Sequence, residues 1–147
     1  PIHLLFALRK AIDMLHAEGL ENAYLRHRLL AEAVRRAVAA WSEGQVLGFN
    51  IAEASERSNT VTTVTMNGFD PAALQRYCKD KCGVVLGLGI GDLADQAFRI
   101  AHMGHVNAPM ILGTLAVVET GLTALKIPHG KGGVGAAIEY LGENVSA

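Results

Sequence analysis

The sequence is poor in aromatic residues, in cysteine and in excess charge of either sign. Aromatic residues make up 5% of the 147 residues and hydrophobic residues 50%, so the core must be built from Leu, Val, Ile and Ala. The formal net charge is −1 with both signs interspersed, which leaves no basic surface for nucleic acid or for a membrane. The two cysteines, Cys78 and Cys82, form no disulfide framework, which favours a reducing, cytoplasmic compartment.

Long hydrophobic runs are missing as well. Charges interrupt each helical stretch well before the length that crosses a bilayer, and no basic segment followed by an apolar run marks a secretory signal. The chain opens instead on an amphipathic pattern with Leu4, Leu8, Ile12 and Leu15 on one face, and Pro1 is tolerated in a first helical turn. A natural chain seldom starts inside such a helix, so we expect a truncated sequence in preference to a processed or tagged one.

Periodicity and capping residues predict the elements of the chain. We predict helices at residues 1–18, 21–41, 70–81, 107–125 and 134–141. Runs of β-branched and apolar residues predict strands at 60–66, 83–86 and 97–101, with a further short strand at 45–49. This order implies an α+β fold: a small, mainly antiparallel sheet of three or four strands, with helices on one face, preceded by two helices.

Three local patterns are weak candidates for binding sites. Cys78 and Cys82 with His102 and His105 have the residue types of a zinc site, but loop knuckles of the CxxC type are missing, so we expect no metal. Residues Gly130 to Gly133 precede a helix with no strand ahead of them and are predicted to be a flexible linker.

The third pattern is the run from Gly87 to Gly91. Its glycines, Gly87, Gly89 and Gly91, are typical of loops that hold a phosphate, but the chain after them returns into a strand and forms no helix. We therefore expect Gly87–Gln96 to be a mobile or tightly turning loop beside a site.

Arg99 is the candidate binding residue. It lies inside a predicted strand between Phe98 and Ile100, and because strand side chains alternate, it points away from both. Arginine suits the two-pronged capture of a carboxylate. An exposed strand arginine without a binding role remains the alternative at this point.

Two motifs identify a family: EGLEN-xx-xRH from Glu18 to His27, and FRI-x-HMG from Phe98 to Gly104. With residues 3–35, the strand TVTTVTM and the segment DPAALQRYCKDKCGVVL, they resemble the C-terminal third of class V, fold-type I pyridoxal-phosphate aminotransferases. The nearest resemblance is to alanine–glyoxylate and serine–glyoxylate aminotransferases. It implies that Arg99 binds the substrate α-carboxylate. Ala101 departs from the family's usual glycine, and the tail at 126–147 extends past the usual family end without an assigned role.

The resemblance also implies what the rest of the enzyme supplies. The pyridoxal 5'-phosphate, its Schiff-base lysine and its phosphate site belong to a large domain upstream, and no lysine of this chain suits that role; the lysines are Lys10, Lys79, Lys81, Lys126 and Lys131. We expect linking helices at 1–42 and an α+β small domain at 43–147 of a homodimeric enzyme. That enzyme would transfer an amino group from alanine or serine to glyoxylate or pyruvate. The chain alone, without its large domain, would be inactive, and the loop Gly87–Gln96 would line the active-site entrance.

Two other functions stay open. One is a non-catalytic domain that binds small carboxylates or a partner protein. The other is a different family member, such as a pyridoxamine–pyruvate aminotransferase or a cysteine desulfurase. The desulfurase is disfavoured because neither Cys78 nor Cys82 lies in a long mobile loop. The coding sequence upstream of Pro1 separates an enzyme from a free-standing domain.

Overall fold

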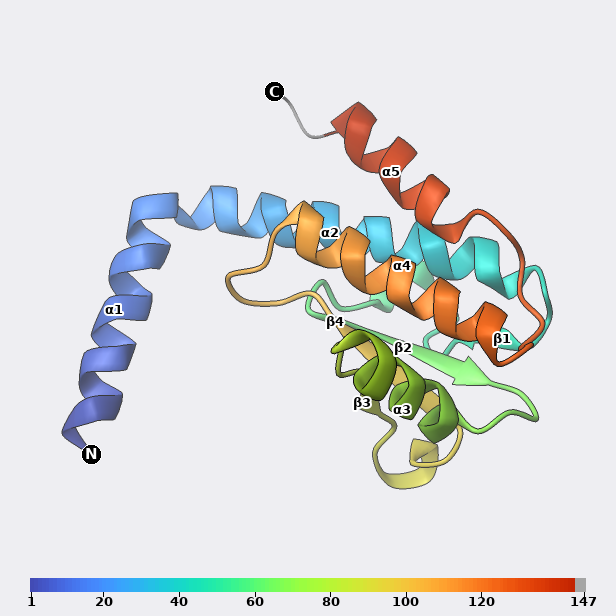
Figure 1. Ribbon diagram of the computed structural model, residues 1–147. Coiled ribbons are helices and arrows are strands. Elements are labelled where there is room, and N and C mark those ends of the chain that lie inside the picture. Colours follow the sequence, from blue (N-terminus) through green and yellow to red (C-terminus); the bar gives the residue numbers. More distant parts are fainter. Residues whose placement is uncertain (145–147) are drawn as a thin grey trace.

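A computed structural model describes residues 1–144 and shows an α+β fold that begins with two helices (Figure 1). The last three residues of the tail lie outside the described residues. The helices are α1 (Ile2–Glu18), α2 (Leu20–Ser42), α3 (Pro71–Cys82), α4 (Ala108–Ala124) and α5 (Gly133–Asn144). The strands are β1 (Leu47–Phe49), β2 (Val61–Met66), β3 (Gly87–Leu88) and β4 (Ala97–Ala101). Short 3₁₀ turns occupy Ala54–Glu56 and Gly91–Leu93. The predicted fold class is confirmed.

The sheet has the order β1-β2-β4-β3, and each neighbouring pair is antiparallel. Burial alternates along β2, so that Thr62, Val64 and Met66 face the core, and Phe98 and Ile100 of β4 lie on the same side. The helices pack on this side and leave the other face of the sheet uncovered (Figure 1). The uncovered face is therefore where a strand can present a polar side chain.

The helix starts follow the capping residues of the sequence. The Asp70 side chain accepts a hydrogen bond from the Ala72 amide at 2.8 Å, and Pro71 occupies the first turn of α3. The Asn107 side chain likewise accepts from the Met110 amide at 3.0 Å to begin α4. Both predicted starts are confirmed.

The predicted strand at 83–86 is wrong, because β3 is Gly87–Leu88, inside the predicted loop. Gly83 ends α3 in the left-handed conformation at φ 71, and the Val84 amide donates to the Cys78 carbonyl at 3.0 Å. The backbone of these residues therefore completes the helix end and does not pair in the sheet. Pairing with β4 begins only at Gly87.

Two glycines of the predicted linker at 130–133, Gly130 and Gly133, pack closely against α2. A Cβ atom on Gly130 would lie 2.0 Å from the Ala40 carbonyl oxygen, and one on Gly133 would lie 2.1 Å from Trp41 Nε1. The Gly130 amide donates to the Trp41 carbonyl at 3.0 Å. Glycine is needed here for space, since side chains would push α5 off α2.

The two N-terminal helices differ in burial. The second half of α2 is part of the core, with Val34, Val38 and Trp41 fully buried, whereas α1 has no buried residue and leaves the body at Gly19 (Figure 1). The division of the chain into 1–42 and 43–147 remains a prediction. In the described part of the chain, no helix combines the length and hydropathy that crossing a membrane requires.

We expect the chain to self-associate through α1. Eight large apolar side chains of this helix are between 37% and 69% exposed, and apolar patches of this size mark interfaces. Sedimentation velocity should show a mass that rises with concentration, and Leu4→Glu with Leu8→Glu should abolish the rise. Ile138→Glu, at an exposed position of α5, serves as the control and should leave the association intact. A strictly monomeric chain at high concentration would contradict this expectation.

Candidate functional site

Arg99 lies in the middle of the sheet, on its uncovered face. In the pairing of β4 with its neighbours, Arg99 stands opposite Thr63 of β2 on one side and Gly87 of β3 on the other. Phe98 and Ile100 are 0% and 1% exposed, whereas Arg99 is half-buried. The orientation predicted from strand alternation is confirmed, and the binding role of Arg99 remains a prediction.

The guanidinium of Arg99 is held at one edge and open at the other. Its Nε donates a hydrogen bond to the Leu88 carbonyl oxygen at 2.8 Å. Among residues 1–144, no carboxylate forms an ion pair with Arg99, and its two Nη atoms make no recorded hydrogen bond. Two parallel N–H donors are therefore available for a planar acceptor such as a carboxylate.

The glycine run beside Arg99 is a tight turn. A Cβ on Gly87 would lie 3.3 Å from the Cβ and Nε of Arg99, and a Cβ on Gly89 would lie 1.8 Å from the Leu93 carbonyl oxygen. Gly91 has φ +60, which favours glycine. The chain then returns into β4 through one short 3₁₀ turn, so the run lacks the long helix that a phosphate loop needs.

The structure brings the two family motifs together, a contact that sequence reasoning missed. Arg26 binds both carboxylate oxygens of Glu18, and its Nη1 donates to the carbonyls of Gly104 at 2.8 Å and Val106 at 2.9 Å. The hydrogen bond from Arg26 lowers the pKa of Glu18. These contacts tie the bend between α1 and α2 to the loop that follows β4.

His27 adds a second contact to the same loop. Its Nδ1 lies 2.6 Å from the Ala23 carbonyl oxygen and must donate, while its Nε2 accepts from the Gly104 amide at 3.0 Å. These partners define a neutral ring protonated at Nδ1. The residues of this contact are 77 positions apart, so spacing along the sequence could not reveal it.

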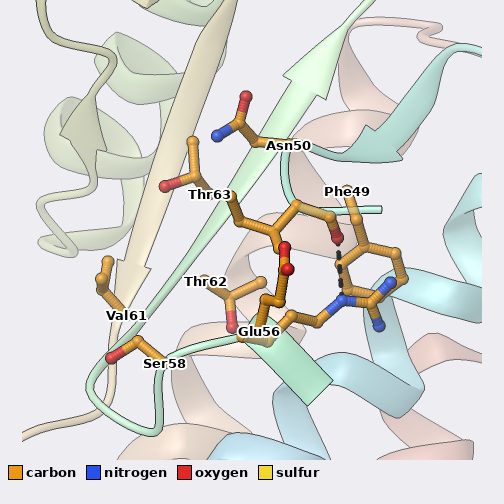
Figure 2. Close-up of a pocket in the computed structure, with 9 residues that line it drawn as sticks. Phe49, Asn50, Glu56, Ser58, Val61, Thr62 and Thr63 are labelled. Atoms are coloured by element: carbon orange, nitrogen blue, oxygen red, sulfur yellow. Dashed lines mark hydrogen bonds between the residues drawn. The ribbon is translucent and has the colours of Figure 1, made fainter. Parts of the chain in front are cut away.

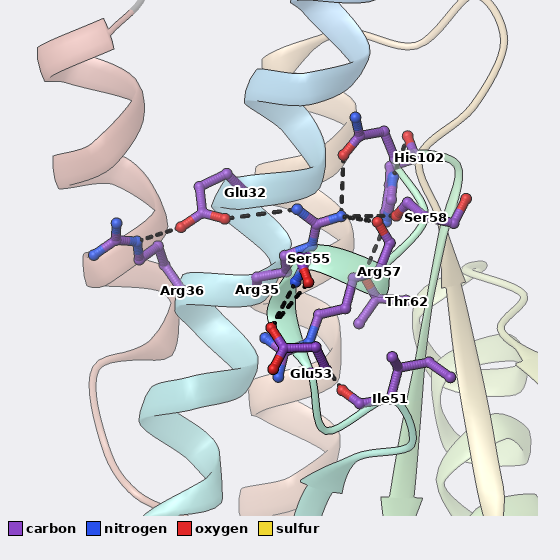
Figure 3. A network of polar contacts seen from close by, with 11 residues as sticks. Glu32, Arg35, Arg36, Ile51, Glu53, Ser55, Arg57, Ser58, Thr62 and His102 are labelled. Carbon is purple, nitrogen blue, oxygen red and sulfur yellow. Dashed lines mark hydrogen bonds and ion pairs between the residues drawn. The ribbon is translucent and has the colours of Figure 1, made fainter.

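The four candidate zinc ligands do not assemble. His102 is fully buried and sits between Thr62 Oγ1 at 2.9 Å and the Asn59 carbonyl at 3.1 Å (Figure 3). Cys78 is buried, and burial raises the pKa of its thiol to about 11, whereas Cys82 is exposed. Within residues 1–144, no three His, Cys, Asp or Glu side chains are placed to hold a metal ion. Full burial and two hydrogen-bond partners make His102 a core residue.

A cleft of about 260 Å³ lies beside β2, lined by residues that include Phe49, Thr62 and Thr63 (Figure 2). Arg57 forms one wall, since it stacks on the Phe49 ring at 3.8 Å and donates to the Ile51 and Ala52 carbonyls. Its charge is therefore used to hold the segment between β1 and β2. The cleft does not include Arg99.

A pyridoxal-type cofactor does not fit this chain by itself. All five lysines are exposed. A lysine that forms a stable Schiff base needs a desolvated pocket or a neighbouring cation.

Comparisons with known proteins cover nearly the whole chain but a minor part of each relative. No protein-family model matches. The chain is 39% identical over 149 residues to serine–glyoxylate aminotransferase of Methylorubrum extorquens, a match that covers 98% of this chain and 35% of the relative. A relative of the same name from Arabidopsis thaliana is 39% identical over 148 residues, with the same coverage.

Solved structures also match most of this chain and a minor part of their own length. The fold matches ureidoglycine–glyoxylate aminotransferase from Bacillus subtilis with a TM-score of 0.83 and 26% identity, over 94% of this chain and 35% of that one. Pyridoxamine–pyruvate aminotransferase from Mesorhizobium loti matches with a TM-score of 0.80 and 30% identity, over 89% of this chain and 33% of that one. The chain thus spans about a third of the length of the proteins it matches.

The sequence and the fold match the C-terminal part of aminotransferases. Within that class, the chain is homologous to the C-terminal part of the serine–glyoxylate and alanine–glyoxylate aminotransferases, and its structural neighbours are class V enzymes. The resemblance noted from the motifs is confirmed.

Proposed function

We propose that the chain acts as the C-terminal part of a pyridoxal-phosphate aminotransferase, in which Arg99 anchors the α-carboxylate of the substrate. The observation that carries this proposal is the open Nη edge of Arg99 on the uncovered face of the sheet. A guanidinium held in this way presents two parallel donors to a carboxylate and fixes both its position and its plane.

The amino donor is alanine or serine, and the acceptor is glyoxylate or pyruvate. The support for this assignment is the names of the relatives and of a solved structure, which combine serine with glyoxylate, alanine with glyoxylate and pyridoxamine with pyruvate. Each of these amino and keto acids carries a carboxylate beside the reacting carbon. One arginine can therefore serve both half-reactions of the transfer, since both substrates present the same group.

The remaining parts of the enzyme lie outside this chain. A large domain would bind pyridoxal 5'-phosphate and supply the lysine, and the exposed apolar side of α1 is available to pack against it. We further propose a cytoplasmic homodimer. The loop Gly87–Gln96, next to Arg99, would border the entrance to the active site.

The direct test is a transamination assay of the full-length enzyme with alanine or serine and with glyoxylate or pyruvate. Formation of the new amino acid supports the proposal. The alternative is a domain that binds small carboxylates without a cofactor. It would be favoured if the full-length protein showed no transfer while the 147-residue chain bound glyoxylate or pyruvate in an Arg99-dependent manner.

The isolated chain should form no stable aldimine with pyridoxal phosphate. All five lysines are exposed, so any imine would be open to water and would hydrolyse during dialysis. Absorbance spectra before and after dialysis, followed by borohydride reduction and peptide mass analysis, check this. A single modified lysine that survives dialysis would contradict the expectation, and Lys131 at the start of α5 would be the first to test.

A further inference from the structure

The side chain of Arg99 does not extend freely from its strand but lies across β3. Its register partner on this side is Gly87, while its Nε donates to the carbonyl of the next residue, Leu88, at 2.8 Å. The guanidinium is therefore drawn diagonally over the edge strand. One of its donors is already used inside the protein.

Gly87 makes room for this arrangement. A Cβ built on Gly87 would lie 3.3 Å from Arg99 Cβ, 3.3 Å from Nε and 3.4 Å from Nη2, so the close approach runs along much of the arginine side chain. Gly87 has no positive φ, in contrast to Gly91 at φ +60. Space, and not backbone conformation, is what requires glycine at position 87.

The edge strand is held in place by the turn that follows it. The Gly89 amide donates to the Ala97 carbonyl at 2.8 Å, and Gly89 lies so close to the Leu93 carbonyl that a Cβ would be 1.8 Å from its oxygen. A strand of only two residues, paired on one side, gains its position from this turn. The Leu88 carbonyl is thus a fixed acceptor.

We propose that Gly87 and the Leu88 carbonyl form a positioning element that orients Arg99 for end-on recognition of a carboxylate. Because Nε already donates a hydrogen bond to the Leu88 carbonyl, a carboxylate cannot bind side-on through Nε and Nη2. It must approach end-on, towards the two Nη atoms. The orientation stands on the geometry alone, whereas its effect on substrate rests on the proposed function of Arg99.

The orientation is tested by NMR on the ¹⁵N-labelled chain. The Nε–H signal of Arg99, assigned by its loss in Arg99→Lys, should exchange slowly with water in the unaltered protein. Gly87→Ala should speed that exchange about fivefold, the ratio that corresponds to one ordinary hydrogen bond. Gly113→Ala is the matched control, since its Cβ meets nothing within 4 Å, and it should leave the signal unchanged.

The effect on substrate is tested in the full-length enzyme. Gly87→Ala should raise KM for amino and keto substrates about fivefold, with kcat changed less, while Gly113→Ala should not change KM. Rapid exchange of Arg99 Nε–H in the unaltered chain would overturn the proposal even if Gly87→Ala failed to fold. A different outcome separates the two proposals. If the Nε–H exchange is slow in the unaltered chain and fast in Gly87→Ala, but neither Gly87→Ala nor Arg99→Ala changes the kinetics, the orientation is upheld and the proposed function is rejected.

Discussion

In the full-length enzyme, Arg99→Ala is expected to lower kcat/KM by about thirty- to a thousandfold, or about 2–4 kcal/mol, for both the amino and the keto substrate. The two substrates present a carboxylate to the same open guanidinium edge, and charge-assisted, paired hydrogen bonds in a partly desolvated site exceed ordinary ones. Most of the loss should appear as a raised KM. Steady-state kinetics with each substrate varied separately measures it.

Two variants control this experiment. Arg99→Lys should recover only part of the activity, because an ammonium keeps the charge but loses the paired donors. Arg76→Ala removes an arginine whose side chain is 62% exposed and pairs with the exposed Asp70, so it should leave the kinetics unchanged. Thermal melts exclude misfolding. Unaltered KM in a folded Arg99→Ala enzyme would end the assignment of Arg99 to substrate binding.

Helix capping and strand alternation predicted those parts of the fold that depend on residues close together in the sequence. The starts of α3 and α4 were predictable because Asp70 and Asn107 each cap their own helix within three residues. The strand Ala97–Ala101 and the outward direction of Arg99 followed from β propensity and alternation alone. For these features, the interactions between neighbouring residues that make the sequence pattern also determine the structure.

The missed features depend on partners distant in the chain. The β3 strand is too short to show a pattern, and its place is set by pairing with residues 10 or 12 positions later. The contacts of Arg26 and His27 with Gly104 join segments that no local rule connects. The burial of His102, expected to be a loop residue, likewise depends on distant partners, since its ring contacts Thr62 of β2 and the Asn59 carbonyl.

The contacts of Arg26 hold the bend at Gly19, between α1 and α2. Gly19 has φ 85, and α1 has no buried residue, so packing of α1 on the body does little to fix the angle between α1 and α2. The Glu18–Arg26 pair and the bonds from Arg26 to Gly104 and Val106 link the end of α1 to the segment after β4. These polar contacts therefore connect the end of α1 to the loop that follows the strand carrying Arg99.

The free energy of unfolding should fall by about 2 kcal/mol between pH 7.5 and pH 5 because of His102. Burial, together with the charge of Arg35, lowers the pKa of His102 to about 4 from 6.5, against the opposing effect of the Asn59 carbonyl. The unfolded chain therefore takes up a proton first as the pH falls. This stability is complete above pH 6.5 and is lost as the pH falls towards 4, up to about 3 kcal/mol.

Urea unfolding followed by the fluorescence of Trp41, the one tryptophan and a fully buried residue, measures this slope at fixed protein concentration. His102→Gln can still donate to Asn59 and accept from Thr62 but carries no titrating group, so its slope between pH 7.5 and 5 should be smaller by about 2 kcal/mol. His3→Gln, on exposed α1, is the control and should keep the slope of the unaltered protein. Equal slopes in the unaltered protein and His102→Gln would show that His102 accepts its proton as readily in the folded as in the unfolded chain, and would refute the buried neutral ring between Thr62 and Asn59.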